Sequence, residues 1–248
     1  MKSLRIFLCV LIAVLAACSI RAQQAVTFAS GDAQANGFLY LPKGSGAHPA
    51  VVVIHEWWGL NDWVKQQAAD FAAKGYVALA VDLYRGKVAD NPDMAHELMR
   101  GLPQDQGVRD LDAAFKFLSA RPDVKRSRIG AIGWCMGGGY AAQLAIAEPT
   151  LRSVVINYGA LPTDKDALAK IHAAVLGNFG ALDQGIPPAS VHAFEDAMKS
   201  LGKPVDAKIY ADAGHAFQNP GNKTGYKPED TADADGRIEK FFSETLKK

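Results

Sequence analysis

Short apolar runs alternate with amphipathic segments from Ala50 onward, and this alternation limits the folds that the chain can adopt. The apolar runs predict buried strands, and the segments between them carry apolar residues at helical spacing. Buried strands that alternate with helices form a parallel sheet covered on both faces. We expect strands at 50–55, 76–81, 153–158, 173–178 and 205–210 and one that ends at Cys135, with helices at 62–74, 105–120, 136–147, 188–201 and 234–246.

The segment before this region has a different pattern. Residues 25–28 and 37–41 are short strand-like segments joined by Gly31-Asp32, which predicts an antiparallel start to the sheet. The predicted fold class is therefore α/β, with a mostly parallel central sheet, an antiparallel N-terminal start and helices on both faces. With 248 residues, 49% of them hydrophobic, the chain is long enough for one sizeable core. We expect a single domain over residues 25–248.

Residues 1–22 have the features of an export signal. Lys2 and Arg5 precede an apolar run at 6–17 that is too short to cross a bilayer as a stable helix. Two cleavage positions are compatible with this segment: before Cys18, the residue that would then be lipidated as in a bacterial lipoprotein, or after Ala22, in which case Cys18 is discarded. We expect an exported, periplasmic protein, anchored to the membrane by lipid in the first case.

The net charge and the cysteine content exclude some classes of function. Lys+Arg number 27 and Asp+Glu 26, for a formal net charge of +1, so the chain lacks the basic surface that nucleic-acid binding requires. Cys9 lies in the predicted signal and Cys18 is either lipidated or removed. Cys135 is then the one thiol of the mature fold, and no intrachain disulfide can form. A free thiol in an oxidising compartment is a liability unless it is buried or useful.

Cys135 lies where a predicted strand runs into a predicted helix. Gly133 and Gly137 flank it at two residues on either side, which matches the G-x-S-x-G turn of a catalytic nucleophile with sulfur in place of oxygen. Glycine is expected there because a sharp turn leaves little room for neighbouring side chains. The alternative is a small apolar residue packed behind the helix, which is common for free cysteine. The glycine context favours the nucleophile.

Asp183 and His215 follow two later predicted strands and complete a triad in the order nucleophile, acid, base that α/β hydrolases show. Thiols are mostly protonated at neutral pH, and an adjacent imidazole can take the proton and return it to the leaving group. A carboxylate on the far ring nitrogen orients the imidazole and stabilises its protonated form. Asp206 and Asp212 lie close to His215 in sequence and are alternative orienting acids or solvated loop charges.

Backbone amides are expected to bind the oxyanion of the tetrahedral intermediate. One is the amide of Met136, because the first N–H groups of a helix have no partner within the helix. A second should come from the loop after the strand at 50–55.

Five short motifs at compatible spacing resemble the dienelactone hydrolase family of α/β hydrolases. The resemblance covers nearly everything from about Gly37 to the C-terminus. The motifs are H-E-x-x-G at 55–59, D-L-Y at 82–84, G-x-C-x-G-G at 133–138, Asp183 followed by Ile186-Pro187, and G-H-x-F at 214–217.

The resemblance implies that Cys135, Asp183 and His215 form a catalytic triad. It also implies that Glu56 contacts the thiol in the resting enzyme and helps to convert it to the thiolate when substrate binds. The alternatives for Glu56 are a loop carboxylate and a buried hydrogen-bond partner of His55.

The resemblance further implies an oxyanion hole made by the amides of Trp57 and Met136. In the founding enzymes an arginine shortly after D-L-Y binds the substrate carboxylate, and Arg85 is the candidate here, although it follows Tyr84 directly where the family often has an intervening residue. Tyr84 is a second candidate for substrate binding.

Aromatic residues near these motifs have two interpretations. Trp57, Trp58, Trp63 and Tyr84 either line an apolar cleft or belong to the core. Residues 86–99 form either a cover over the cleft or a surface loop.

Two cofactor motifs are incomplete. The zinc motif H-E-x-x-H would need histidine at position 59, which is Gly59. The glycines at 133–138 lack the middle glycine of a dinucleotide-binding loop. We therefore expect neither a metal nor a cofactor.

The predicted function is cofactor-independent hydrolysis of a small-molecule lactone or activated carboxylic ester through an acyl-thioester. The alternative is an exported, non-catalytic ligand-binding or thiol-reactive protein on the same scaffold. We expect a monomer or weak homodimer.

Overall fold

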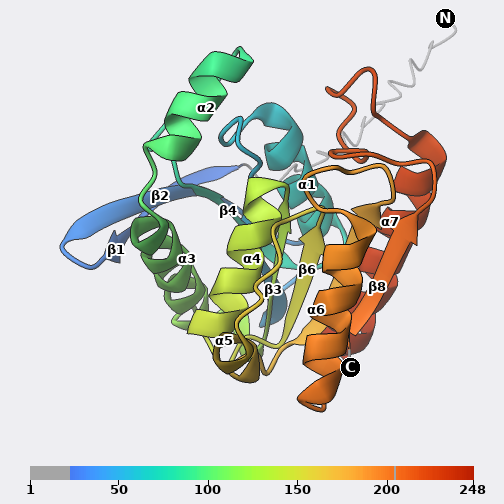
Figure 1. The fold of residues 1–248 in the computed structure, drawn as a ribbon. Coiled ribbons are helices and arrows are strands. Elements are labelled where there is room, and N and C mark those ends of the chain that lie inside the picture. The colour runs from blue at the N-terminus through green and yellow to red at the C-terminus, as the bar shows by residue number, and fades with distance from the viewer. Residues whose placement is uncertain (1–22, 204) are drawn as a thin grey trace, which may run out of the picture.

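Eight strands form one sheet in the computed structural model, which describes residues 23–203 and 205–248 (Figure 1). Their order is β1-β2-β4-β3-β5-β6-β7-β8. β2 pairs antiparallel with both β1 and β4, and all neighbours from β4 to β8 pair in parallel. This confirms the predicted parallel sheet with an antiparallel start. The strands are β1 (Gln24–Ser30), β2 (Ala33–Tyr40), β3 (His48–Ile54), β4 (Val77–Asp82), β5 (Val124–Trp134), β6 (Ser153–Asn157), β7 (Ala174–Gly180) and β8 (Val205–Tyr210).

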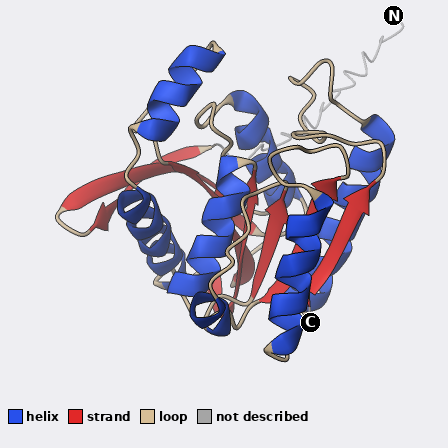
Figure 2. Cartoon of the chain, in the orientation of Figure 1, coloured by secondary structure: helices blue, strands red, loops and turns tan. Residues whose placement is uncertain are grey.

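Helices cover both faces of the sheet, as predicted (Figure 2). α3 (Gln104–Ser119), α4 (Met136–Ala147) and α6 (Pro188–Ser200) pack on one face, and α1 (Asp62–Ala73) and α7 (Pro228–Phe242) pack on the other. β3 shows why its sequence is a continuous apolar run. Val52 and Ile54 belong to the core under α3 and α4, whereas Val51 and Val53 point to the opposite core.

The structure corrects the predicted elements at three places. Residues 92–99, predicted as part of a loop or cover, belong to helix α2 (Pro92–Arg100), which projects from the body of the molecule (Figure 1). Asn91 caps this helix by accepting the N–H of Met94 at 2.9 Å, and only Ala95 is buried. The short helix α5 (Lys165–Ala169) was not predicted, and α7 begins at Pro228 rather than at residue 234 and runs into a π-helical turn at Ser243–Lys247.

The predicted export signal, including Cys18, lies outside the described residues, so export and lipidation stay predictions. Among the helices that the structure describes, none combines the length and the apolar character needed to cross a membrane.

Candidate active site

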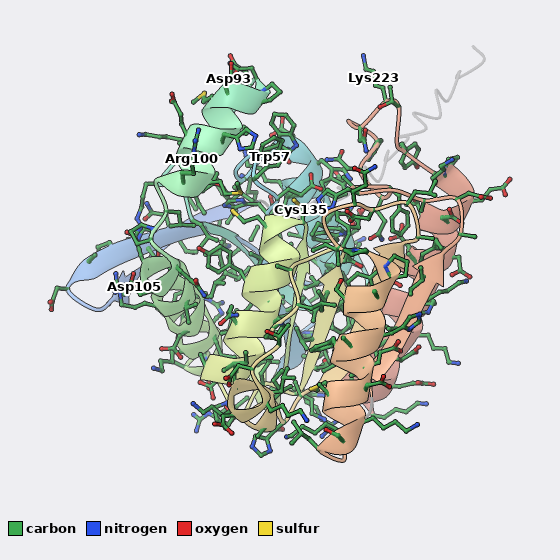
Figure 3. The ribbon with its side chains drawn as sticks, viewed as in Figure 1. Trp57, Asp93, Arg100, Asp105, Cys135 and Lys223 are labelled. Atoms are coloured by element: carbon green, nitrogen blue, oxygen red, sulfur yellow. The ribbon has the colours of Figure 1, made fainter. Side chains whose placement is uncertain are left out.

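Cys135 lies on a sharp turn between β5 and α4, at the carboxyl edge of the parallel strands (Figure 3). Its backbone is in a left-handed conformation, with φ 54°, that side chains rarely adopt and that is typical of strained functional turns. A Cβ on Gly133 would lie 2.0 Å from the carbonyl oxygen of Gly137, and one on Gly137 would lie 2.4 Å from that of Ile54. Both flanking glycines are therefore required by close backbone approach.

The structure brings Cys135, His215 and Asp183 into one hydrogen-bonded chain. His215 Nε2 lies 3.0 Å from Cys135 Sγ, and His215 Nδ1 lies 2.7 Å from Asp183 Oδ2. The other carboxylate oxygen of Asp183 accepts the N–H groups of Gly185 at 2.8 Å and Ile186 at 3.1 Å. Asp183 is 4% exposed, so the carboxylate is held by these bonds rather than by solvent.

The alternative orienting acids lie elsewhere. The carboxylate of Asp206 binds Arg237 at 2.6 Å, and Asp212 is exposed. The Nδ1 atom of His215 is already engaged by Asp183. Asp183 is therefore the acid in position to orient this imidazole.

Electrostatics favour a charged His215–Asp183 pair. Burial lowers the pKa of His215, but its hydrogen bonds and charge interactions with Asp183 and Cys135 outweigh burial and raise that pKa to about 10. Burial likewise raises the pKa of Asp183, but the hydrogen bond and charge of His215 and the two loop amides lower it overall. The imidazole and the carboxylate therefore form an ion pair next to the sulfur of Cys135.

Glu56 is buried beside the triad, but its hydrogen bonds do not go to the thiol as the resemblance predicted. Oε2 accepts a hydrogen bond from Asn219, and Oε1 accepts one from the hydroxyl of Tyr158 at 3.4 Å. Burial raises the pKa of Glu56 to about 7, against the lowering effects of Asn219, His215 and Tyr158. The side chain can therefore change charge near neutral pH.

Tyr158 and Asn219 were missed in the sequence. The Tyr158 ring contacts the edge of the His215 ring, with centroids 5.3 Å apart, while its hydroxyl binds Glu56. Tyr158 ends a predicted strand and Asn219 lies four residues after His215, and neither position carries a motif. Their placement next to Glu56 comes only from the tertiary structure.

His55 connects two loops of the site. Leu83 donates its N–H to His55 Nε2 at 3.2 Å, so Nδ1 carries the proton and donates it to the carbonyl oxygen of Glu56. The ring is fully buried, and burial lowers its pKa despite opposing contributions from Glu56 and Asp82. His55 thereby fastens the loop after β3 to the loop after β4.

The two predicted oxyanion donors lie in the loop after β3 and at the first position of α4. Among the described residues, the N–H groups of Trp57 and Met136 have no hydrogen-bond partner, which leaves both amides available. Tyr84 packs behind them. Its hydroxyl donates to Met136 Sδ at 3.1 Å, and its ring contacts His55.

The structure does not bring Arg85 to the catalytic cleft. Its guanidinium binds the buried carboxylate of Asp110 at 2.7 Å and the carbonyl oxygen of Asp82 at 3.4 Å. Neither Arg85 nor Tyr84 lines the cleft.

The catalytic cleft has a volume of about 1160 Å³ and contains Cys135 and His215 in its wall. Trp57 and Cys135 lie at its floor between α2 and the loop that carries Lys223 (Figure 3). The remaining wall comes from Trp58, Asn61, Asp62, Trp63, Ala89, Met99, Ala216, Asn219, Pro220, Gly221, Asn222 and Thr224. In the described part of the chain, no group of three or more His, Cys, Asp or Glu side chains could hold a metal ion.

Comparisons with known proteins identify the family of this chain. The model of the dienelactone hydrolase family matches residues 35–246. A protein of Methylorubrum extorquens named "putative carboxymethylenebutenolidase" is 32% identical over 82% of this chain and 74% of its own length. A Bradyrhizobium protein named "probable 2-oxo-3-(5-oxofuran-2-ylidene)propanoate lactonase" is 32% identical over 73% of this chain and 77% of its own length. The crystal structure of a "putative dienelactone hydrolase" from Klebsiella pneumoniae superposes with a TM-score of 0.81 at 26% identity, over 90% of this chain and 98% of that one.

Proposed function

Because the chain belongs to the dienelactone hydrolase family and is thus a hydrolase of lactones or esters, we propose that it works through Cys135, His215 and Asp183. The observation that carries this proposal is the hydrogen-bonded chain from Asp183 through His215 to the Cys135 sulfur. A nucleophile, a base and an orienting acid in this arrangement can perform acyl transfer without a cofactor.

The first half of the proposed reaction forms a thioester. The thiol proton moves to His215 Nε2, and the sulfur of Cys135 attacks the carbonyl carbon of the ester. The N–H groups of Trp57 and Met136 bind the resulting oxyanion. When the tetrahedral intermediate collapses, the C–O bond breaks and His215 returns the proton to the departing oxygen.

The second half releases the acid. His215 takes a proton from water, whose oxygen attacks the thioester carbonyl, and the C–S bond then breaks as Cys135 recovers its proton. Asp183 keeps the imidazole in the tautomer that both halves need.

The sulfur nucleophile restricts which esters the enzyme can hydrolyse. A thiolate leaves more readily than an alkoxide, so the first tetrahedral intermediate returns to substrate unless the departing oxygen is stabilised. Enol lactones and activated aryl esters meet this condition, whereas simple alkyl esters and amides do not.

The test is hydrolysis of 4-nitrophenyl acetate by the wild type and by Cys135→Ala. We expect the substitution to lower kcat/KM by at least about 10³-fold, because the covalent route is lost. Intact-protein mass spectrometry of quenched wild type should show one added acetyl group, mapped to Cys135. Hydrolysis by Cys135→Ala at the wild-type rate would refute the proposal. Acetylation of the wild type without turnover would favour the alternative, a thiol-reactive protein.

A further inference from the structure

The charged residues of the catalytic cleft are few and peripheral. Lys223 is the one cation and Asp62 the one acid among the residues that line the cleft, other than His215. Lys223 is exposed and extends from the tip of its loop away from Cys135 (Figure 3). The Asp62 side chain is fully exposed and contacts Lys65 at 3.3 Å. Apart from the His215 imidazole, which is already paired with Asp183, a charged substrate group deep in the cleft would therefore meet no fixed counter-charge.

Two of the three asparagines of the wall, Asn219 and Asn222, hold their own loop in place through side-chain hydrogen bonds. Asn219 donates to Glu56 and accepts the N–H of Gly221 at 2.7 Å. Asn222 donates to the carbonyl oxygens of His215 and Ala216 and accepts the N–H of Gly225 at 3.2 Å. Turning either amide toward a substrate would break a bond of the loop. A carboxylate placed beside them would lose its water without gaining a cation.

Arg85, the predicted carboxylate-binding residue, is held away from the cleft. It pairs at 2.7 Å with Asp110, whose side chain is 1% exposed and also accepts the hydroxyl of Ser30. Releasing Arg85 toward a substrate would leave a buried carboxylate without its cation, which is costly. Arg85 is thus a structural cation in this fold.

Apolar and aromatic side chains form the surface that remains. Trp57 and Trp58 pack against each other with centroids 4.9 Å apart, and Met99 and Trp63 extend the same wall. A cleft of about 1160 Å³ is larger than a small lactone needs and lies just above the range of about 300–1,000 Å³ that is typical of small-molecule pockets. Aromatic walls of this kind favour flat apolar groups.

We infer that the cleft selects an uncharged ester or lactone that carries a bulky aromatic or apolar group, instead of a small anionic lactone. This inference rests on the proposed function and specifies the substrate class of the same site. It follows from three observations: the cleft holds no cation besides the Asp183-paired His215 and the exposed Lys223, Asn219 and Asn222 are engaged within their loop, and tryptophans form the wall.

The experiment compares 4-nitrophenyl 3-phenylpropanoates that carry either a methyl or a carboxylate group at the para position of the phenyl ring. The substituent is remote from the scissile carbonyl, so the two esters have the same leaving group and similar intrinsic reactivity. We expect kcat/KM to be at least about tenfold higher for the methyl compound, because burial of an unpaired carboxylate is unfavourable. Equal values, or a preference for the carboxylate, would overturn the inference.

Three variants test which residues determine the preference between the esters. Trp58→Ala should lower kcat/KM for the methyl compound about tenfold more than for 4-nitrophenyl acetate, since only the larger ester reaches the aromatic wall. Arg85→Gln and Lys223→Ala should each change kcat/KM for the methyl and carboxylate compounds by the same factor. A loss confined to the carboxylate compound in either variant would overturn the inference, and Lys223 is exposed enough that its removal leaves the fold intact.

Failure of the proposed function gives a different result. In that case Cys135→Ala would hydrolyse all three esters at the wild-type rate. If hydrolysis depends on Cys135 but the carboxylate compound is preferred, the proposed function holds and the inference about substrate class is wrong.

Discussion

Two consecutive residues, His55 and Glu56, are both buried in the site and have different roles. His55 is neutral and links two backbone loops, while Glu56 accepts hydrogen bonds from Asn219 and Tyr158. The tertiary contacts of each side chain, rather than its identity, decide its protonation state. Of the two residues, Glu56 is the one whose shifted pKa should make the stability of the fold depend measurably on pH.

We predict that Glu56 destabilises the fold as pH rises. Burial raises its pKa from 4.5 to about 7, so between these values the folded state binds a proton that the unfolded state has lost. The stabilising contribution is fully present below about pH 4.5 and is lost as pH rises through about 7. Glu56→Gln removes this titration; the glutamine oxygen can still accept from Asn219, and its NH2 can donate to the Tyr158 hydroxyl oxygen.

The measurement is urea unfolding of the wild type and Glu56→Gln at pH 5 and pH 8. The stability of the variant relative to the wild type should rise by about 2.5 kcal/mol from pH 5 to pH 8, from the conversion of a pKa shift to free energy. A difference that is independent of pH would contradict the raised pKa.

The sequence predicted the residues of the triad but not their surroundings. Cys135, Asp183 and His215 follow strands, and parallel strands bring their carboxyl ends to one edge of a sheet. Tyr158 and Asn219 act through contacts between segments distant in the sequence, and no local pattern encodes such contacts. The position of Arg85 was equally hidden, since it depends on Asp110 of α3.

At the scale of elements, α4 approaches β3 so closely that residue 137 has no room for a side chain. The helix begins next to the carbonyl groups that end the strand, and a Cβ on Gly137 would lie 2.4 Å from Ile54 O and 2.5 Å from His55 O. The backbone atoms of β3 cannot move aside for an added Cβ, as the end of a flexible side chain can. The first turn of α4, which carries Met136, is therefore positioned by the absence of a side chain at residue 137.

We predict that Gly137→Ala displaces α4 and lowers kcat/KM for 4-nitrophenyl acetate by about 10²-fold, the effect of a misplacement near 1 Å in an active site. Gly139→Ala is the matched control on the same helix. Its Cβ would lie no closer than 3.4 Å to Ala160, and alanine is the better helix former by about 1 kcal/mol. Thermal unfolding should show a lower Tm for Gly137→Ala alone. Equal activities of the two variants would contradict this account.

Elements that are covered on both faces were predicted from the sequence. Elements with few buried residues were missed or given the wrong start. β3 is an apolar run because both of its faces are covered. α2 buries only Ala95, although its apolar residues have helical spacing and Asn91-Pro92 is a recognisable helix start. The first turns of α7 are mostly exposed and acidic, which hid its start at Pro228.

At the scale of the whole molecule, one buried carboxylate joins three distant parts. Asp110 of α3 accepts the Ser30 hydroxyl at 2.5 Å, from the end of β1, and binds Arg85 from the loop after β4 at 2.7 Å. The antiparallel edge, a helix of one face and a loop next to the site thus meet at this side chain. The order and pairing of the strands in the sheet could not be predicted from the alternation of strands and helices alone.

We predict that the two partners of this ion pair contribute unequally to stability. Arg85→Met leaves the Asp110 charge buried with only Ser30, and should cost about 2 kcal/mol, below the range for fully buried pairs because the arginine side chain is 31% exposed. Asp110→Asn should cost less, since Arg85 can reach water and the amide oxygen still accepts the Ser30 hydroxyl.

The double variant Arg85→Met/Asp110→Asn completes the cycle. It should be more stable than Arg85→Met, because it no longer contains the buried Asp110 charge, which has no cation beside it in the single variant. Free energies of unfolding in urea for the four proteins give the coupling directly. If the double variant is no more stable than Arg85→Met, the pair is not what holds Arg85 in place, and the guanidinium is free to turn toward a substrate carboxylate.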